Sequence, residues 1–94
     1  MQFTKHLREP IRRGDVTTSV RIWMSPRVKE GGRYRLEAGF VVVDKVRQIE
    51  WDWISAKMAK DSGFNDVVDL LKTAKHGKGE NVYLIDFHYE ENAD

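Results

Sequence analysis

Polar and apolar residues alternate between positions 16 and 24, and this period of two predicts a β-strand. One face of the strand is mostly apolar and is expected to line a core: Val16, Thr18, Val20, Ile22 and Met24. The opposite face is a row of hydrogen-bonding groups that ends in an aromatic ring: Thr17, Ser19, Arg21 and Trp23. This row suits a small polar ligand or a nucleobase, although the solvated outer face of a half-buried sheet has the same pattern.

Three further segments have apolar residues spaced as on one face of a helix. They cover residues 5–13, 52–62 and 65–75. In the first, Leu7 and Ile11 lie four residues apart, and Gly14 is suited to end the helix in a left-handed conformation. Asp52 and Asn65 are suited to cap the second and third helices. The third helix has a broad apolar stripe, so we expect it to pack against a sheet.

Two more strand regions are rich in valine and aromatic residues. The run from residue 36 to residue 49 predicts one long strand or two consecutive strands, with Gly39 at a bulge or corner. Residues 25–33 precede this run and are expected to form a loop. Residues 81–89 are the clearest strand, because one face carries only large side chains suited to a core: Tyr83, Ile85, Phe87 and Tyr89.

Together these elements predict a single α+β domain that spans residues 1–94. The strand regions carry enough apolar residues to enclose a core, whereas each helix has only one apolar face. We therefore expect the strands to curve into a small β-barrel, with three helices packed outside it or across its mouth. The acidic tail from about residue 90 is expected to fray.

Composition excludes several kinds of site. The chain has no cysteine, so disulfides, thiolate nucleophiles and cysteine-bound metals are absent, which fits a reducing compartment. The spacing of His6, His76 and His88 matches no metal site, and the glycine–lysine loop at 76–79 lacks the spacing of a phosphate-binding loop. We therefore expect no metal and no cofactor. No apolar run approaches the roughly 20 residues that cross a bilayer, and no secretory signal is present, so a cytoplasmic protein without a membrane partner is expected.

Charge is distributed unevenly along the chain. The formal net charge is only +1, yet residues 1–35 contain nine Lys and Arg residues against three Asp and Glu residues. If the fold gathers these cations on one side, they form a patch that attracts phosphates. The candidates for contacts with a nucleic-acid backbone are Arg12, Arg13, Arg27, Arg33 and Arg35. The alternative is that these arginines are dispersed around the domain and only increase its solubility.

Several short motifs follow one another in a recognisable order. They comprise Ile11, Gly14, Thr17 and Arg21 around the first strand, then Gly32, Gly63 with Phe64, and the closing strand Tyr83–Phe87. This order, over nearly the whole chain, resembles the ASCH superfamily, whose fold is a PUA-like β-barrel. The resemblance implies a cleft between barrel and helices that binds RNA or a nucleotide. It is closest in size to small bacterial members, some of which are amidohydrolases that act on acylated cytidine.

The chain departs from those amidohydrolases at positions that the resemblance makes catalytic. Where they have a catalytic lysine, this chain has Val16, which supplies neither a base nor a positive charge. A second hydroxyl-bearing position corresponds to Ser19, which keeps the hydroxyl. The acidic position corresponds to Ser62, with Asp61 adjacent. Two of three catalytic groups are therefore missing or displaced, which disfavours an enzyme.

The first hypothesis is thus a non-catalytic module that binds RNA or a modified nucleotide. In it, Arg21 binds a phosphate or a base carbonyl, Thr17 and Ser19 supply directional hydrogen bonds, and Trp23 stacks on a base. For Trp23 the alternative is a packing role in the core. For Arg21 the alternative is an ion pair with a carboxylate, for which the candidates are Asp86 and Glu37.

Two other functions remain open. The runner-up is a hydrolase of an amide or phosphodiester bond, or a ribonuclease, that uses other residues around the same cleft. Its candidate residues are Asp15, Ser19, Asp61 and His88. The third is a protein-interaction adaptor in which Trp51, Trp53 or the acidic tail meets a partner.

Overall fold

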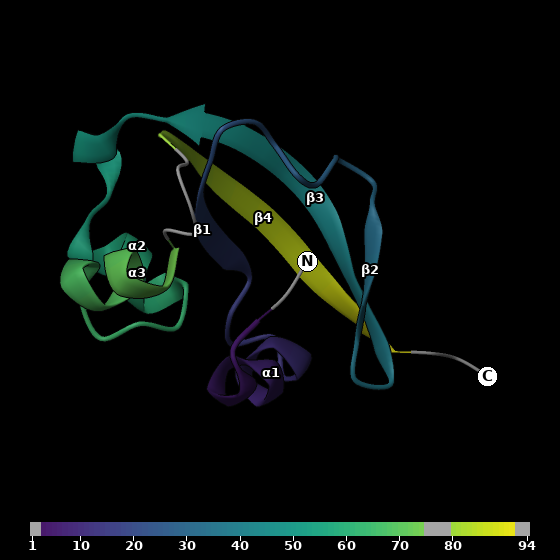
Figure 1. The fold of residues 1–94 in the computed structure, drawn as a ribbon. Helices are drawn as coiled ribbons and strands as arrows, with labels where there is room; N and C mark the ends of the chain where they lie inside the picture. The colour runs from purple at the N-terminus through teal and green to yellow at the C-terminus, as the bar shows by residue number, and fades with distance from the viewer. Residues whose placement is uncertain (1–2, 75–79, 92–94) are drawn as a thin grey trace.

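The computed structural model describes residues 3–74 and 80–91 of the chain, and these form an α+β domain (Figure 1). The described elements are, in chain order, α1 (Lys5–Arg12), β1 (Thr18–Trp23), β2 (Arg33–Leu36), β3 (Gly39–Ile49), the 3₁₀ turn η1 (Trp51–Trp53), α2 (Ala56–Asp61), α3 (Val67–Ala74) and β4 (Asn81–Glu91). The α+β class and the three helices agree with the prediction. None of the described helices has the length and apolar character needed to span a membrane. The loop at 76–79 lies outside the described residues.

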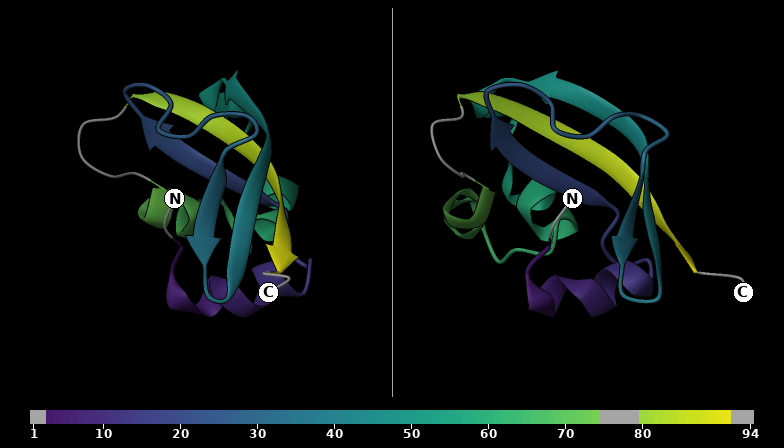
Figure 2. Two further views of the ribbon diagram at one scale, coloured as in Figure 1. Left: turned by 90° about the vertical axis from the view of Figure 1, so that its right-hand side faces the viewer. Right: turned by 45° about the vertical axis from the view of Figure 1, so that its right-hand side comes forward.

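The four described strands form one antiparallel sheet in the order β1-β4-β3-β2. The sheet curls strongly around its own axis, with the long strands β3 and β4 in the middle (Figures 1 and 2). The edge strands β1 and β2 do not pair with each other, so the curled sheet is a half-barrel. This agrees with the prediction that the strands curve around a core as in a small barrel.

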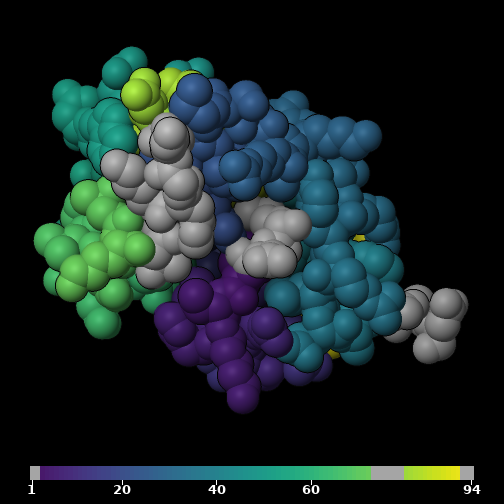
Figure 3. Space-filling model, viewed as in Figure 1, coloured from purple at the N-terminus to yellow at the C-terminus, as the bar shows by residue number. Residues whose placement is uncertain are grey.

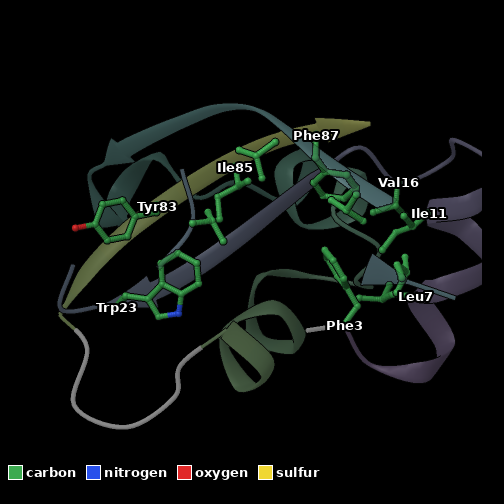
Figure 4. Packing of buried hydrophobic residues seen from close by; sticks show 12 residues of the cluster. Phe3, Leu7, Ile11, Val16, Trp23, Tyr83, Ile85 and Phe87 are labelled. Carbon is green, nitrogen blue, oxygen red and sulfur yellow. The ribbon is translucent and has the colours of Figure 1, made fainter. Parts of the chain in front are cut away.

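Two apolar clusters lie on opposite faces of this sheet. On the inner face of the curl, α1 and Phe3 pack on the middle of the sheet, with Phe3 and Phe87 at 5.5 Å between ring centroids (Figure 4). This cluster joins both edge strands, because it contains Trp23 of β1 and Leu36 of β2. On the outer face, α2 and α3 cover a second cluster at one end of the sheet: Val20, Ile22, Ile49, Ala59, Leu70, Val82 and Leu84. The helices leave the outer face of the β2–β3 hairpin uncovered.

Strand β1 is therefore covered on both faces. The prediction that residues 16–24 have one continuous core face is wrong at its two ends, Val16 and Met24. Val20 and Ile22 lie under the helices as predicted, but Val16 precedes the strand and packs in the inner cluster. Met24 follows the strand and is 63% exposed. The period of two holds only while the backbone stays in the strand, from residue 18 to residue 23.

The second predicted helix, over 52–62, is wrong in its first half. Asp52 lies in the turn η1, and extended backbone at Ile54 and Ser55 interrupts the helix. Helix α2 begins after Ser55, whose Oγ accepts the backbone N–H of Met58 at 3.1 Å. Helix α3 is capped by Asp66 rather than Asn65, because the Asp66 Oδ1 accepts the backbone N–H of Asp69 at 2.8 Å.

The run from residue 36 to residue 49 covers the last residue of β2 and all of β3, so it agrees with the prediction of two consecutive strands with a corner at Gly39. The turn between β2 and β3 has two residues, and its first, Glu37, has a φ of +53°, as mirror-image hairpin turns require. Gly39 begins β3, where a Cβ would collide with the Glu90 carbonyl and the Tyr89 ring. The described part of the acidic tail is not frayed, because Glu90 and Glu91 pair with the start of β3.

Candidate functional site

The predicted polar row on β1 faces inward and is largely covered. Thr17 is exposed just before the strand, and its carbonyl accepts the backbone N–H of Phe87 at 2.9 Å. Ser19 is buried, and Trp23 is 5% exposed with its ring 6.0 Å from that of Tyr83. Trp23 thus occupies the packing role that the sequence left as an alternative to base stacking.

Arg21 lies half-buried between these residues. Its Nε donates to the Oγ of Ser19 at 2.8 Å, and its guanidinium lies over the Phe3 ring at 5.0 Å from the centroid. Burial lowers the pKa of Arg21, because the charged form loses solvent. Both carboxylates suggested as ion-pair partners lie with other arginines: Asp86 with Arg47 at 2.8 Å and Glu37 with Arg8 at 3.2 Å. The described contacts of Arg21 connect β1 to the segment before α1, on the inner face of the sheet.

The two positions where the resemblance implied lost catalytic groups are packing positions. Val16 is buried in the inner cluster. Ser62 ends α2, is 2% exposed, and shares a hydrogen bond of 2.9 Å with the Oγ1 of Thr18. The neighbouring Asp61 is exposed and pairs with Lys57 at 3.0 Å. A lysine at position 16 or a carboxylate at position 62 would be buried.

The candidate residues of a hydrolase are not brought together. Ser19 faces inward on β1, whereas His88 faces outward on β4. Asp15 pairs with Arg13 at 3.0 Å near the end of α1, and Asp61 lies on α2. Nucleophile and base must lie within hydrogen-bond reach of each other, so this set does not form a catalytic unit.

The predicted backbone-contact arginines lie on three separate segments. Arg12 and Arg13 end α1, Arg27 is in the β1–β2 loop, and Arg33 and Arg35 are on β2. Figure 3 shows α1, in purple, below the loop and the hairpin, in blue and teal. Three of the five form ion pairs: Arg12 with Glu9, Arg13 with Asp15 and Arg33 with Glu90. Their spread over three segments fits the dispersed alternative. Arg33 and Arg35 lie on the same face of β2.

These two arginines share one aromatic ring on the outer face of the hairpin. The Cζ of Arg33 lies 4.8 Å and that of Arg35 lies 5.3 Å from the centroid of Phe40. The hairpin register explains the arrangement, because Arg35 pairs with Phe40 and Arg33 lies two residues away on the same face. The Arg33 side chain is 53% exposed, so its guanidinium is accessible to solvent.

An ion-pair network adjoins this ring. The Nδ1 of His88 lies 2.8 Å and 3.0 Å from the two carboxylate oxygens of Asp44, and its Nε2 lies 3.0 Å from Glu90. The other oxygen of Glu90 accepts from Arg33 at 3.0 Å. Asp44 reaches His88 because the register shifts between Val43 and Lys45. We call this group the outer charged face: Arg33, Arg35, Phe40, Asp44, His88 and Glu90.

The network changes the pKa values of its members. Hydrogen bonds to Asp44 and Glu90 raise the pKa of His88 above its usual 6.5. The hydrogen bond from His88 lowers the pKa of Glu90 below its usual 4.5, and Arg33 adds to this effect. Within the described residues, no three histidine or acidic side chains are arranged to hold a metal ion. The carboxylates of Asp44 and Glu90 lie in ion pairs with His88 and Arg33.

Sequence reasoning missed Phe40, Asp44 and Glu90 as site residues. The pattern Arg-x-Arg at 33 and 35 predicts two guanidinium groups on one strand face. It does not reveal the ring opposite them, since that depends on the turn and the register. The exposed aromatics of the adaptor hypothesis are present on η1, where Trp51 is 48% and Trp53 is 63% exposed.

Comparison of the chain with protein-family models, with curated proteins and with solved structures gave no significant match. The structure supports the general description of an α+β half-barrel, which is less specific than a PUA-like barrel. Membership of the ASCH superfamily therefore stays a proposal based on the short motifs.

Proposed function

We propose that this protein is a non-catalytic, ASCH-like module that binds single-stranded RNA or a nucleotide through the outer charged face. One observation carries the proposal: two exposed guanidinium groups are held against a single ring, Phe40, at 4.8 Å and 5.3 Å, on a sheet face that no described helix covers. Guanidinium planes stack on bases and bind phosphate oxygens through a fork of donors.

The ring makes this pair of arginines well suited to such contacts. A free arginine side chain loses rotamer entropy when a ligand immobilises it, and a cation–π contact reduces that loss by restricting the side chain beforehand. Arg33 and Arg35 are also on a strand, which keeps their spacing constant. A rigid sheet face with arginines beside an aromatic ring is a usual platform for single-stranded nucleic acid.

Binding without turnover is supported by the placement of the candidate catalytic residues that the structure describes. Val16 and Ser62 are buried packing residues, and Ser19 and His88 face opposite sides of the sheet. For the predicted row on β1, a ligand role remains a proposal. Thr17 is its exposed member, so a nucleotide that reached the inner face would meet Thr17 first.

The test is a titration of labelled single-stranded oligouridylate with wild type and with the variant Arg33→Ala/Arg35→Ala, at about 50 mM and about 200 mM salt. Wild type should bind, more weakly at the higher salt. The variant should lose about 1–3 kcal/mol of binding free energy for each specific contact removed and show a smaller salt slope.

The matched control is Arg12→Ala/Arg13→Ala, which also removes two exposed arginines but at the end of α1, off the outer charged face. It should bind RNA nearly as wild type does. Equal affinity of wild type and Arg33→Ala/Arg35→Ala would overturn the proposed surface. Equal losses in that variant and the control would show attraction by net charge alone.

A protein-interaction function is the second candidate, and the exposure of Trp51 and Trp53 favours it. Both residues follow β3 at the end opposite the hairpin. Under the first proposal, Trp51→Ala/Trp53→Ala should leave RNA affinity unchanged. Loss of RNA binding in this variant would move the nucleic-acid surface to η1.

A further inference from the structure

His88 has an unusual placement for a half-exposed histidine, because both ring nitrogens face carboxylate oxygens. Nδ1 meets Asp44 at 2.8 Å and Nε2 meets Glu90 at 3.0 Å. An ionised carboxylate only accepts hydrogen bonds, whereas a neutral imidazole has one N–H and one acceptor nitrogen. Both contacts are therefore favourable only when the ring carries two protons. The geometry fits the imidazolium form of His88.

The proton on His88 decides the charge of its surroundings. Asp44 on β3 and Glu90 on β4 face the ring directly, and Arg33 on β2 shares Glu90 with it. Arg35 lies beside Arg33 over the same ring. Two arginines offset two carboxylates, so these groups together are positive when His88 is protonated and neutral when it is not.

Other charged groups near the network do not alter this dependence. Farther along the outer face, Arg47 and Asp86 form a pair at 2.8 Å. Lys45 follows the bulge on β3. Glu30 in the loop before β2 accepts the backbone N–H of Val46 at 3.1 Å. None of these side chains is within hydrogen-bond distance of the His88 ring among the described contacts.

Loss of the proton also changes what Glu90 does to Arg33. In the protonated state the carboxylate is shared between His88 and Arg33, with contacts of 3.0 Å to each. Without the second N–H, the ring no longer offsets the charge of Glu90 or of Asp44, and Glu90 keeps its contact with Arg33. Both carboxylates then repel a phosphate more strongly. The raised pKa of His88 puts this change above 6.5, toward neutral pH.

We infer, building on the proposed function, that His88 is a proton-dependent switch of the outer charged face: the face binds single-stranded RNA more tightly when His88 is protonated than when it is neutral. The switch acts through Glu90 on Arg33, so His88 regulates the site and need not touch the ligand. A single exposed charge should change the affinity about two- to fivefold.

The experiment measures the affinity for labelled oligouridylate from about pH 6 to about pH 8.5, around the titration range of histidine. Wild type should bind about two- to fivefold more weakly at the high end. His88→Gln should show a nearly flat profile. The control is His6→Gln, since His6 is an exposed histidine on α1 away from this face, and it should keep the wild-type pH dependence.

A second variant and a measurement without RNA make the test stringent. Asp44→Asn removes the carboxylate that faces Nδ1 of His88, so the imidazolium is less stabilised. The midpoint of the affinity profile should therefore move to lower pH. An NMR titration of the His88 ring in free wild type should give a pKa above 6.5, and Glu90→Gln should lower it. Thermal melts of each variant establish that it is folded before its affinity is compared.

The outcomes separate the switch from the proposed function. RNA binding with no pH dependence, or a dependence that persists in His88→Gln, overturns the switch and leaves the binding module intact. No RNA binding at any pH overturns both. If the NMR titration gives a pKa at or below 6.5, the imidazolium assignment is wrong, and the switch fails on that ground alone.

Discussion

At the scale of the residue, Arg21 combines a permanent charge with a half-buried position on the inner face. Its guanidinium donates to Ser19 at 2.8 Å and lies over the ring of Phe3, so the cost of desolvation is offset by a hydrogen bond and a cation–π contact. The same side chain links the strand β1 to the segment that precedes α1. Its described contacts are those of a packing residue.

We predict that Arg21→Ala lowers the melting temperature, with a loss of about 1–3 kcal/mol in unfolding free energy, because the buried Ser19 hydroxyl loses its donor and Phe3 loses its cation–π contact. Thermal melts of wild type, Arg21→Ala and Arg21→Lys measure the effect. The lysine variant keeps the charge but not the planar group, so it should recover only part of the stability. An unchanged melting temperature combined with weaker RNA binding would instead return Arg21 to the ligand site.

At the scale of the element, the β2–β3 hairpin determines where the outer charged face lies. Its two-residue turn places Arg35 opposite Phe40, and the irregularity between Val43 and Lys45 brings Asp44 to His88. Gly39 allows the hairpin to pack closely on β4, because a Cβ there would collide with the Glu90 carbonyl and with the Tyr89 ring. The pairing of β3 with the end of β4 depends on this glycine.

We predict that Gly39→Ala destabilises the protein by about 1–3 kcal/mol, as expected when a side chain is forced into a packed region. It should also weaken RNA binding, because Phe40 and Glu90 are paired at the next position. The comparison variant is Gly31→Ala, where a Cβ meets open space and the positive φ costs about 1 kcal/mol. Urea unfolding of the two variants gives the measurement; equal losses would contradict a steric role for Gly39.

At the scale of the whole molecule, the sheet separates two kinds of surface. The inner face is closed by α1 and Phe3, and the outer face is closed by α2 and α3 at one end only. The remaining outer surface carries charged residues around Phe40. Among the described residues, the candidate nucleophile Ser19 and the candidate base His88 face opposite sides of the sheet. Both observations support the proposal of a binding module over that of a hydrolase.

We predict little or no turnover of acylated cytidine, because Val16 and Ser62 occupy the positions that the resemblance makes catalytic. Val16→Lys should not restore activity. It would place an ammonium in the inner cluster and lower the melting temperature, while the acid would still be absent. Chromatographic assay of released cytidine, with melts of both proteins, tests this. Turnover like that of lysine-bearing amidohydrolases would contradict it.

Local signals determined much of the fold without any knowledge of tertiary structure. The spacing of Leu7 and Ile11 correctly predicted α1, and Gly14 follows it with a φ of +81°. The alternation from Tyr83 to Tyr89 correctly predicted that one face of β4 lines the core. These features depend on the period of a helix or strand and on the backbone freedom of single residues, so they are encoded in neighbouring positions.

Only the tertiary structure decided which polar residues are covered and which are exposed together. Ser19, Arg21 and Trp23 alternate like a surface row, yet Phe3 lies against Arg21 and Trp23 is buried in the inner cluster, so that face is largely covered. The outer charged face joins residues up to 57 positions apart, from Arg33 to Glu90. Strand order and register bring such residues together, and these depend on how the whole chain buries its apolar surface, which no local pattern specifies.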